Sequence, residues 1–142
     1  MAEAKRKIVF ELGGTYVQLK DNGSAAPVEA GPDFWTRFAG QPDLAEGRLV
    51  WAAAQVRDWA NWERNPNGDA LYYLLSGAVD MMVEVGESEH TISLRPNNAC
   101  VVPRGVWHRL IVQKPANLLA VTKSAGKEQR PVEQKKQAEP KR

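Results

Sequence analysis

Short runs in which apolar and polar residues alternate are the feature that most constrains the fold of this chain. Apolar residues occupy every second position of 79–85, and the same period of two recurs in 91–95 and 106–112. This period is typical of strands with one buried face. Turn-forming residues separate the runs, namely Ser76-Gly77, Gly86-Glu87, Pro96-Asn97-Asn98 and Arg104-Gly105. Several short strands at such spacing predict an antiparallel barrel or sandwich.

The first half of the chain adds further strands and one helix to this prediction. The segment 8–20 predicts one or two strands, and 24–31 predicts a loop. A proline and an aspartate open the segment 31–38, and its aromatic residues follow at helical spacing, so we expect a short helix there. The run 47–58 is apolar on both faces. It predicts a strand that is covered on both sides, as it would be at a dimer interface.

Two motifs in the second half of the chain have a recognisable form. Leu71–Gly77 is an aromatic-rich strand that ends in glycine, and Pro103-Arg104-Gly105-Val106-Trp107-His108 has the form Pro-x-Gly-x-x-His. In this order they resemble the two motifs of the cupin family, closely at the motifs and more loosely over 47–122. The resemblance implies an all-β fold, a cupin-like double-stranded β-helix (jelly-roll barrel), here with a short N-terminal helix.

The metal-binding positions of the family are altered in this chain. Cupins that hold a metal use two histidines two residues apart, a glutamate and the histidine of the second motif. The resemblance places these positions at Glu63, Asn65, Ala70 and His108. A catalytic divalent metal usually needs three ligands from His, Asp, Glu or Cys, and only two are present. We therefore expect no tightly bound metal and no other cofactor; if a metal binds, its ligands are Glu63, Asn65 and His108, with Asp69 as a further candidate.

His108 shares its strand face with aliphatic residues, which favours a neutral imidazole with a hydrogen-bond partner. The resemblance brings Glu63 inside the barrel and makes it the candidate partner. Two interpretations of His108 stay open: a functional group, either a polar anchor for a ligand or half of a His–Glu acid–base pair, and a core histidine without a function. Tyr72 and Tyr73 point to opposite faces, so one hydroxyl reaches the cavity, and the sequence leaves open which one.

The tryptophans beside the former metal positions have two interpretations. Trp62 and Trp107 adjoin Glu63 and His108, so their rings should lie on the opposite strand face. We expect them to fill the outer side of the sheet, and stacking on a ligand is the alternative. Trp59 lies in a predicted loop, where it could border the mouth of the pocket.

The charges of the chain are unevenly distributed. The 142 residues fit one domain. We expect a disordered basic N-terminus over 1–7 (net +2), a cupin-like β-barrel domain over 8–122 (net −4) and a disordered basic C-terminal tail over 123–142 (net +4). The tail lacks interleaved aromatic residues and any nucleic-acid motif, which argues against nucleic acid as a partner.

The remaining composition bears on location. The sequence contains no run of 18 apolar residues, so we expect no membrane span. Its single cysteine, Cys100, is flanked by two valines, which predicts a buried structural thiol. One cysteine forms no internal disulfide and is typical of a cytoplasmic protein.

Three functional hypotheses follow from these observations. In the first, the barrel cavity binds a small organic molecule without a tightly bound metal, and its polar groups are Glu63, Asn65 and His108 together with Tyr72 or Tyr73. In the second, the chain is a metal-dependent cupin enzyme of the dioxygenase or isomerase type with a rebuilt site. In the third, it is a non-catalytic structural dimer with a filled barrel. We expect a homodimer in each case, and the sequence leaves open whether any reaction is catalysed.

Overall fold

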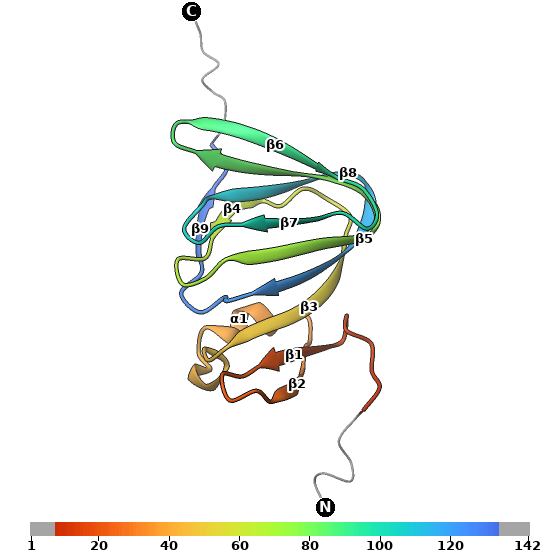
Figure 1. The fold of residues 1–142 in the computed structure, drawn as a ribbon, viewed down its shortest axis with the longest axis vertical. Coiled ribbons are helices and arrows are strands. Elements are labelled where there is room, and N and C mark those ends of the chain that lie inside the picture. Colours follow the sequence, from red (N-terminus) through yellow and green to blue (C-terminus); the bar gives the residue numbers. More distant parts are fainter. Residues whose placement is uncertain (1–7, 134–142) are drawn as a thin grey trace, which may run out of the picture.

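The computed structural model describes residues 8–133, which form nine strands and little helix (Figure 1). The strands are β1 (Thr15–Leu19), β2 (Ala25–Glu29), β3 (Arg48–Gln55), β4 (Asn61–Arg64), β5 (Ala70–Val85), β6 (Ser88–Leu94), β7 (Ala99–Val102), β8 (His108–Thr122) and β9 (Glu128–Pro131). The helices are α1 (Phe34–Phe38) and the 3₁₀ turn η2 (Pro42–Leu44). The prediction of an all-β fold with a short N-terminal helix is confirmed.

Two long strands, β5 and β8, organise the sheet because they pair with each other along most of their length. Around one half of this pair the strand order is β2-β1-β3-β8-β5-β7, and around the other half it is β9-β4-β8-β5-β6. All of these pairings are antiparallel. The result is the double-layered arrangement of a jelly roll, in which both layers share their central strands (Figure 1).

The bend that separates the two halves of β5 lies at Gly77. Ser76-Gly77 is an irregularity inside one strand, so the prediction of a turn there is wrong. Gly77 has φ 88°, and a Cβ at this position would lie 2.3 Å from the carbonyl oxygen of Pro115. Only glycine tolerates both the positive φ and this close approach of β8.

The bend also changes which residues of β5 face the interior. The buried residues Ala70, Tyr72 and Leu74 before the bend have even numbers, whereas Val79, Met81 and Val83, which follow the register shift at Ala78, have odd numbers. On β8 the interior residues keep one parity from His108 to Thr122. These side chains form the main core, in which each fully buried aliphatic residue contributes about 1.5–3 kcal/mol.

A smaller aromatic cluster packs beside α1 at one end of the barrel. Tyr16, Phe34, Leu44 and Leu49 are buried there, and Trp35 packs against them. The Tyr16 and Phe34 rings meet edge to face with centroids 4.8 Å apart. The short helix predicted for 31–38 therefore exists because its apolar side packs on β1 and β3.

Two predictions about irregular segments need correction. The predicted loop 24–31 contains β2, which forms a hairpin with β1. The predicted disordered tail begins too early, because residues 123–133 are described and include β9, which pairs with β4. The pairing uses backbone hydrogen bonds, so it needs no apolar sequence. Residues 1–7 and 134–142, predicted as disordered, lie outside the described residues.

The outer face of the sheet around β3 carries an apolar row. Five residues on β1, β3, β8, β5 and β7 are register partners across the sheet, namely Val17, Val50, Val121, Leu71 and Val101. Val101 is 58% exposed. Nothing in the described part of the single chain covers this row fully. Of the two faces of β3 that were predicted to be covered, only the inner face is covered within one chain. No helix within residues 8–133 has the length and apolar character needed to cross a membrane.

Candidate functional site

A pocket of about 260 Å³ opens at the end of the barrel that α1 covers. Segments far apart in the sequence build it: α1, β3, β4 with the residues on either side of it, β5, and the chain from the end of β8 to β9. The lining residues are Trp35, Trp51, Ala53, Gln55, Trp59, Glu63, Asn65, Tyr72, Thr122, Ser124, Lys127 and Gln129. Three of the five predicted ligand-binding residues, Glu63, Asn65 and Tyr72, are therefore brought together.

Three indole rings form the walls of this pocket. The Trp35 and Trp51 rings meet edge to face at 5.7 Å, and Trp59 meets Tyr72 in the same way at 6.0 Å. The indole N–H of Trp51 donates to Thr122 Oγ1 at 3.1 Å, and that of Trp59 donates to Gln55 Oε1 at 2.9 Å. Because both N–H groups are satisfied within the chain, these two rings offer a ligand mainly their apolar faces.

Asn65 supplies an unsatisfied polar atom in the pocket. It follows β4 and is 4% exposed, and its backbone carbonyl oxygen accepts a hydrogen bond from the backbone N–H of Gly105 at 3.0 Å. Its side-chain Oδ1 is buried without a hydrogen-bond partner among the described residues. A buried acceptor left unpaired costs about 1–3 kcal/mol, so this atom is a position at which a ligand gains affinity.

Glu63 faces the pocket from β4 and meets residues of the chain that follows β8. Gln129 on β9 is its register partner and donates from Nε2 to Glu63 Oε2 at 3.0 Å. Lys127 lies in the turn before β9, and its Nζ is 4.2 Å from the centroid of the Trp35 ring. The pocket lining thus holds one carboxylate and one ammonium group.

His108 is fully buried beside the pocket, and its partner is Tyr72, where the sequence predicted Glu63. His108 Nδ1 lies 3.0 Å from the carbonyl oxygen of Val106. A carbonyl oxygen only accepts, so Nδ1 carries the proton, and Nε2 accepts from the Tyr72 hydroxyl at 2.9 Å. Glu63 is the register partner of His108 across β4 and β8 and acts on it as a nearby charge.

The charge state of the pair agrees with these hydrogen bonds. Burial lowers the pKa of His108, while the Val106 carbonyl and the Glu63 charge act in the opposite direction and Lys127 lowers it further. Burial also raises the pKa of Tyr72 well above its usual value, with a further contribution from Glu63. Both side chains are therefore neutral at pH 7, and the Tyr72 hydroxyl keeps its proton.

Tyr73 lies on the other face of β5 and takes no part in the pocket. Its hydroxyl donates to Asn97 Oδ1 at 2.6 Å on the outer surface. The bend at Gly77 does not affect this choice, because Tyr72 and Tyr73 both precede it. Of the two tyrosines, Tyr72 is therefore the one that faces the pocket, and Tyr73 is excluded as a pocket residue.

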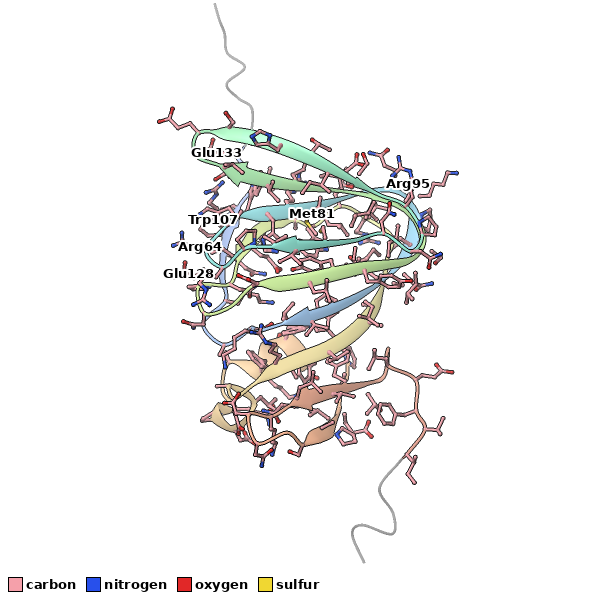
Figure 2. The ribbon with its side chains drawn as sticks, viewed as in Figure 1. Arg64, Met81, Arg95, Trp107, Glu128 and Glu133 are labelled. Carbon is pink, nitrogen blue, oxygen red and sulfur yellow. The ribbon has the colours of Figure 1, made fainter. Side chains whose placement is uncertain are left out.

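The outer face of β4 and β9 carries the other two tryptophans. The Arg130 guanidinium lies 5.3 Å from the Trp62 ring and 4.7 Å from the Trp107 ring, and Arg64 lies 4.6 Å from the Trp107 ring. Arg64, Trp107 and Glu128 lie on one side of the molecule in Figure 2. The prediction that Trp62 and Trp107 point away from the faces of residues 63 and 108 is confirmed. A larger groove of about 820 Å³ adjoins Trp62 here, outside the barrel.

The donor set does not fit a metal ion. Both ring nitrogens of His108 are engaged, one by Val106 and one by Tyr72. Ala70 brings no ligand atom, and the carboxylate of Asp69 accepts the backbone N–H of Arg104 on the surface at 2.9 Å. Within residues 8–133 no group of three His, Cys, Asp or Glu residues has a metal-binding arrangement.

Sequence reasoning missed several residues of the pocket. Lys127 and Gln129 fell in the predicted disordered tail, and Ser124 lies between them and β8. The signal that was available is Ser124-Ala125-Gly126, a turn sequence between β8 and a further run. Gly126 has φ 79°, and the side-chain amide of Asn67 donates to the Ala125 carbonyl at 2.9 Å, which holds this turn against the loop after β4.

Comparison with known proteins gives a resemblance in fold. No protein-family model matches the chain, and no curated protein matches it. Among solved structures, a cupin-2 domain protein from Shewanella frigidimarina is 14% identical, with a TM-score of 0.44 over 52% of this chain and 68% of that chain. Hydroquinone 1,2-dioxygenase from a Sphingomonas species is 13% identical, with a TM-score of 0.46 over 56% of this chain and 62% of that chain.

A variant of oxalate decarboxylase from Bacillus subtilis is 18% identical, with a TM-score of 0.49 over 54% of this chain and 21% of that chain. The chain therefore spans less than two thirds of some of these proteins. Cupins are among the structures that it resembles, as its two motifs predict. At these identities the resemblance concerns the fold and says nothing about the ligand or reaction of this chain.

Proposed function

We propose that the chain binds a small organic molecule in the 260 Å³ pocket, without a tightly bound transition metal. The observation that carries the proposal is the Asn65 side chain, which lines the pocket with a buried Oδ1 that has no partner. Natural interiors satisfy nearly all buried polar atoms, so an unpaired acceptor beside a cavity needs a partner from outside the chain, and a bound ligand would supply it.

The aromatic walls support the same function. Three tryptophans and one tyrosine around so small a volume provide a large apolar contact area for one ligand, and few polar groups then fix its orientation. The volume lies below the range of about 300–1,000 Å³ usual for drug-sized ligands, so the bound molecule is small.

A metal-dependent enzyme, the second hypothesis, has less support because His108 has no free ring nitrogen. Metal analysis of protein purified without a chelating tag tests it, and a stoichiometric transition metal would revive it. The third hypothesis is a structural dimer with a filled barrel. Met81 and Leu110 are fully buried in one half of the barrel, whereas the half around Asn65 contains the pocket, which favours the first hypothesis.

Homodimerisation is a separate proposal, supported by the apolar row that ends at Leu71 and Val101 on the outer sheet face. A second copy would present the same uncharged row to the first, as in an isologous dimer. Sedimentation velocity on the full chain measures the mass directly. A monomer over the whole concentration range would contradict this proposal and would leave the pocket unaffected.

The test of ligand binding uses Asn65→Leu, which keeps a similar volume and removes the unpaired acceptor. We screen a diverse fragment library by thermal shift and confirm each hit by intrinsic tryptophan fluorescence, which reports on Trp35, Trp51 and Trp59. Hits should bind the wild type at least about fivefold more tightly than Asn65→Leu, because one hydrogen bond to a buried acceptor is worth about 1–3 kcal/mol.

The matched control is Asn117→Leu, because Asn117 lies on the outer surface and its amide donates to Ser76 Oγ at 3.2 Å. It should bind every hit as the wild type does. Asn65→Leu should also fold with unchanged or higher stability, since it removes an unsatisfied group. A library that yields no hit, or hits that bind both variants equally, would overturn the proposed function.

A further inference from the structure

Three hydrogen-bond acceptors line the pocket near Asn65. Asn65 Oδ1 has no partner. Glu63 presents a carboxylate, of which Oε2 already accepts from Gln129 at 3.0 Å. The Tyr72 hydroxyl donates its hydrogen bond to His108 Nε2, so only its lone pairs remain for a ligand. A ligand group that satisfies these three acceptors must therefore donate hydrogen bonds.

The charge near Asn65 points to a donor that is positively charged. The Glu63 carboxylate is close enough to Tyr72 and His108 to add to the burial-raised pKa of the tyrosine and to oppose the lowering of the histidine pKa by burial. It is the one acidic side chain in the lining. A protonated amine would gain a charge-assisted hydrogen bond from it, which is stronger than a neutral one.

The aromatic walls are compatible with such a cation. The faces of Trp51 and Trp59 remain available because their N–H groups are satisfied elsewhere. The protein itself places an ammonium group on the neighbouring ring, since Lys127 Nζ lies 4.2 Å from the Trp35 centroid. Cation–π contacts of this kind contribute about 0.5–2 kcal/mol, depending on how far the cation is removed from water.

The lining also carries one positive charge, on Lys127. Lys127 lines both this pocket and an adjoining surface depression of about 560 Å³ along α1, so it lies at the mouth. It is the one basic side chain in the lining, and no ion pair is recorded for it among residues 8–133. A ligand that carried only a positive charge would be repelled by it, whereas a carboxylate would be attracted.

We propose that the ligand is a zwitterion of amino-acid size, whose protonated amine contacts Glu63 and Asn65 and whose carboxylate pairs with Lys127. This inference rests on the proposed function and adds the chemical class of the ligand. The one negative and one positive charge of the lining match a ligand of zero net charge. A volume of about 260 Å³ limits it to a molecule of this size.

The experiment titrates the full chain with the twenty common amino acids, glycine betaine and 4-aminobutyrate, and follows intrinsic fluorescence and calorimetric heat. For the amino acid that binds most tightly, the matched probes are its amide, which lacks the carboxylate charge, and its N-acetyl derivative, which lacks the amine charge. Each probe should bind at least tenfold more weakly than the zwitterion.

Two variants assign the two charges to residues. Lys127→Met should weaken the zwitterion about tenfold and leave the affinity for the amide unchanged or improved. Glu63→Gln should weaken the zwitterion and the amide alike. Lys114→Met is the control, because Lys114 is an exposed residue of β8 outside the pocket lining, and it should change nothing.

The failures of the two proposals are distinguishable. If the amide and the N-acetyl derivative bind as tightly as the amino acid, or if neutral fragments bind in an Asn65-dependent manner while no zwitterion does, the zwitterion proposal is overturned and the pocket remains a binding site. If neither the zwitterions nor the fragment library binds, both proposals are overturned.

Discussion

The two faces of the ribbon formed by β4 and β9 have opposite characters, although the same two strands supply both faces. On the outer face, Arg64 pairs with Glu128 at 2.6 Å and Arg130 pairs with Glu84, while both arginines also lie on tryptophan rings. On the inner face, Asn65 keeps an unpaired acceptor. A strand alternates its side chains, so one ribbon can hold the sheet together on one side and leave a binding site on the other.

From this difference we expect the outer face to contribute to stability and the inner face to ligand binding. The outer face joins β9 to β4 and β5 through groups that satisfy each other. The inner face holds polar groups in an arrangement that is incomplete by one hydrogen bond. Substitutions on the outer face should therefore change the free energy of unfolding, and substitutions on the inner face should change ligand affinity first.

The largest expected effect is that of Trp62→Ala on stability. Trp62 is 7% exposed on the outer face and carries the Arg130 guanidinium. Truncation of a buried tryptophan costs about 3–5 kcal/mol, because it removes apolar contact and leaves a cavity. Urea denaturation measures the loss. A change below about 1 kcal/mol would show that the outer face does not hold β9 in place.

The second-largest expected effect is the difference in stability between substitutions at two adjacent residues of β5. Tyr72→Phe should lower the free energy of unfolding by about 1–3 kcal/mol, since it leaves His108 Nε2 buried without a donor. Tyr73→Phe is the matched control and should cost less than about 0.5 kcal/mol, because its hydroxyl lies in an exposed hydrogen bond with Asn97. Equal losses in the two variants would contradict the assignment of Tyr72 to the interior.

The smallest expected effect is a pH dependence that originates on the inner face. Because the pKa of His108 is lowered in the folded chain, the unfolded chain binds its proton more readily below about pH 6.5. The contribution to stability is complete above that pH and is lost as the pH falls toward the lowered pKa. Urea denaturation between pH 5 and 8 measures the slope.

The control for this measurement removes the titrating side chain. His108→Gln should flatten the slope, because it removes the group whose pKa differs between the folded and the unfolded chain. A slope that persists unchanged in His108→Gln would contradict the assignment.

Much of the fold was predictable because it follows from local patterns. The alternating runs identify β6, the second half of β5 and the start of β8, and the aromatic cluster at 34–38 identifies α1. The turn predicted at Ser76-Gly77 was wrong because glycine there serves a close approach to Pro115, which lies on a strand 38 positions later in the chain. A glycine in a strand has the same sequence signal in either role.

The candidate site was predictable in part. Glu63 and Asn65 follow from the cupin resemblance, and both line the pocket. Lys127 was not predicted as a pocket residue, because it enters from a segment whose position depends on packing against distant strands. No local pattern indicates that residue 35 and residue 127 will meet, yet Lys127 Nζ lies on the Trp35 ring.

The sequence by itself determined where strands form and which residues share a strand face, since both depend on a period of two and on turn chemistry within a few residues. The tertiary structure alone decided that Tyr72 faces inward, that it is the partner of His108, and that the chain after Thr122 returns to complete the pocket. A period of two defines two faces but not which of them is buried, and that choice depends on the pairing register of strands far apart in the chain.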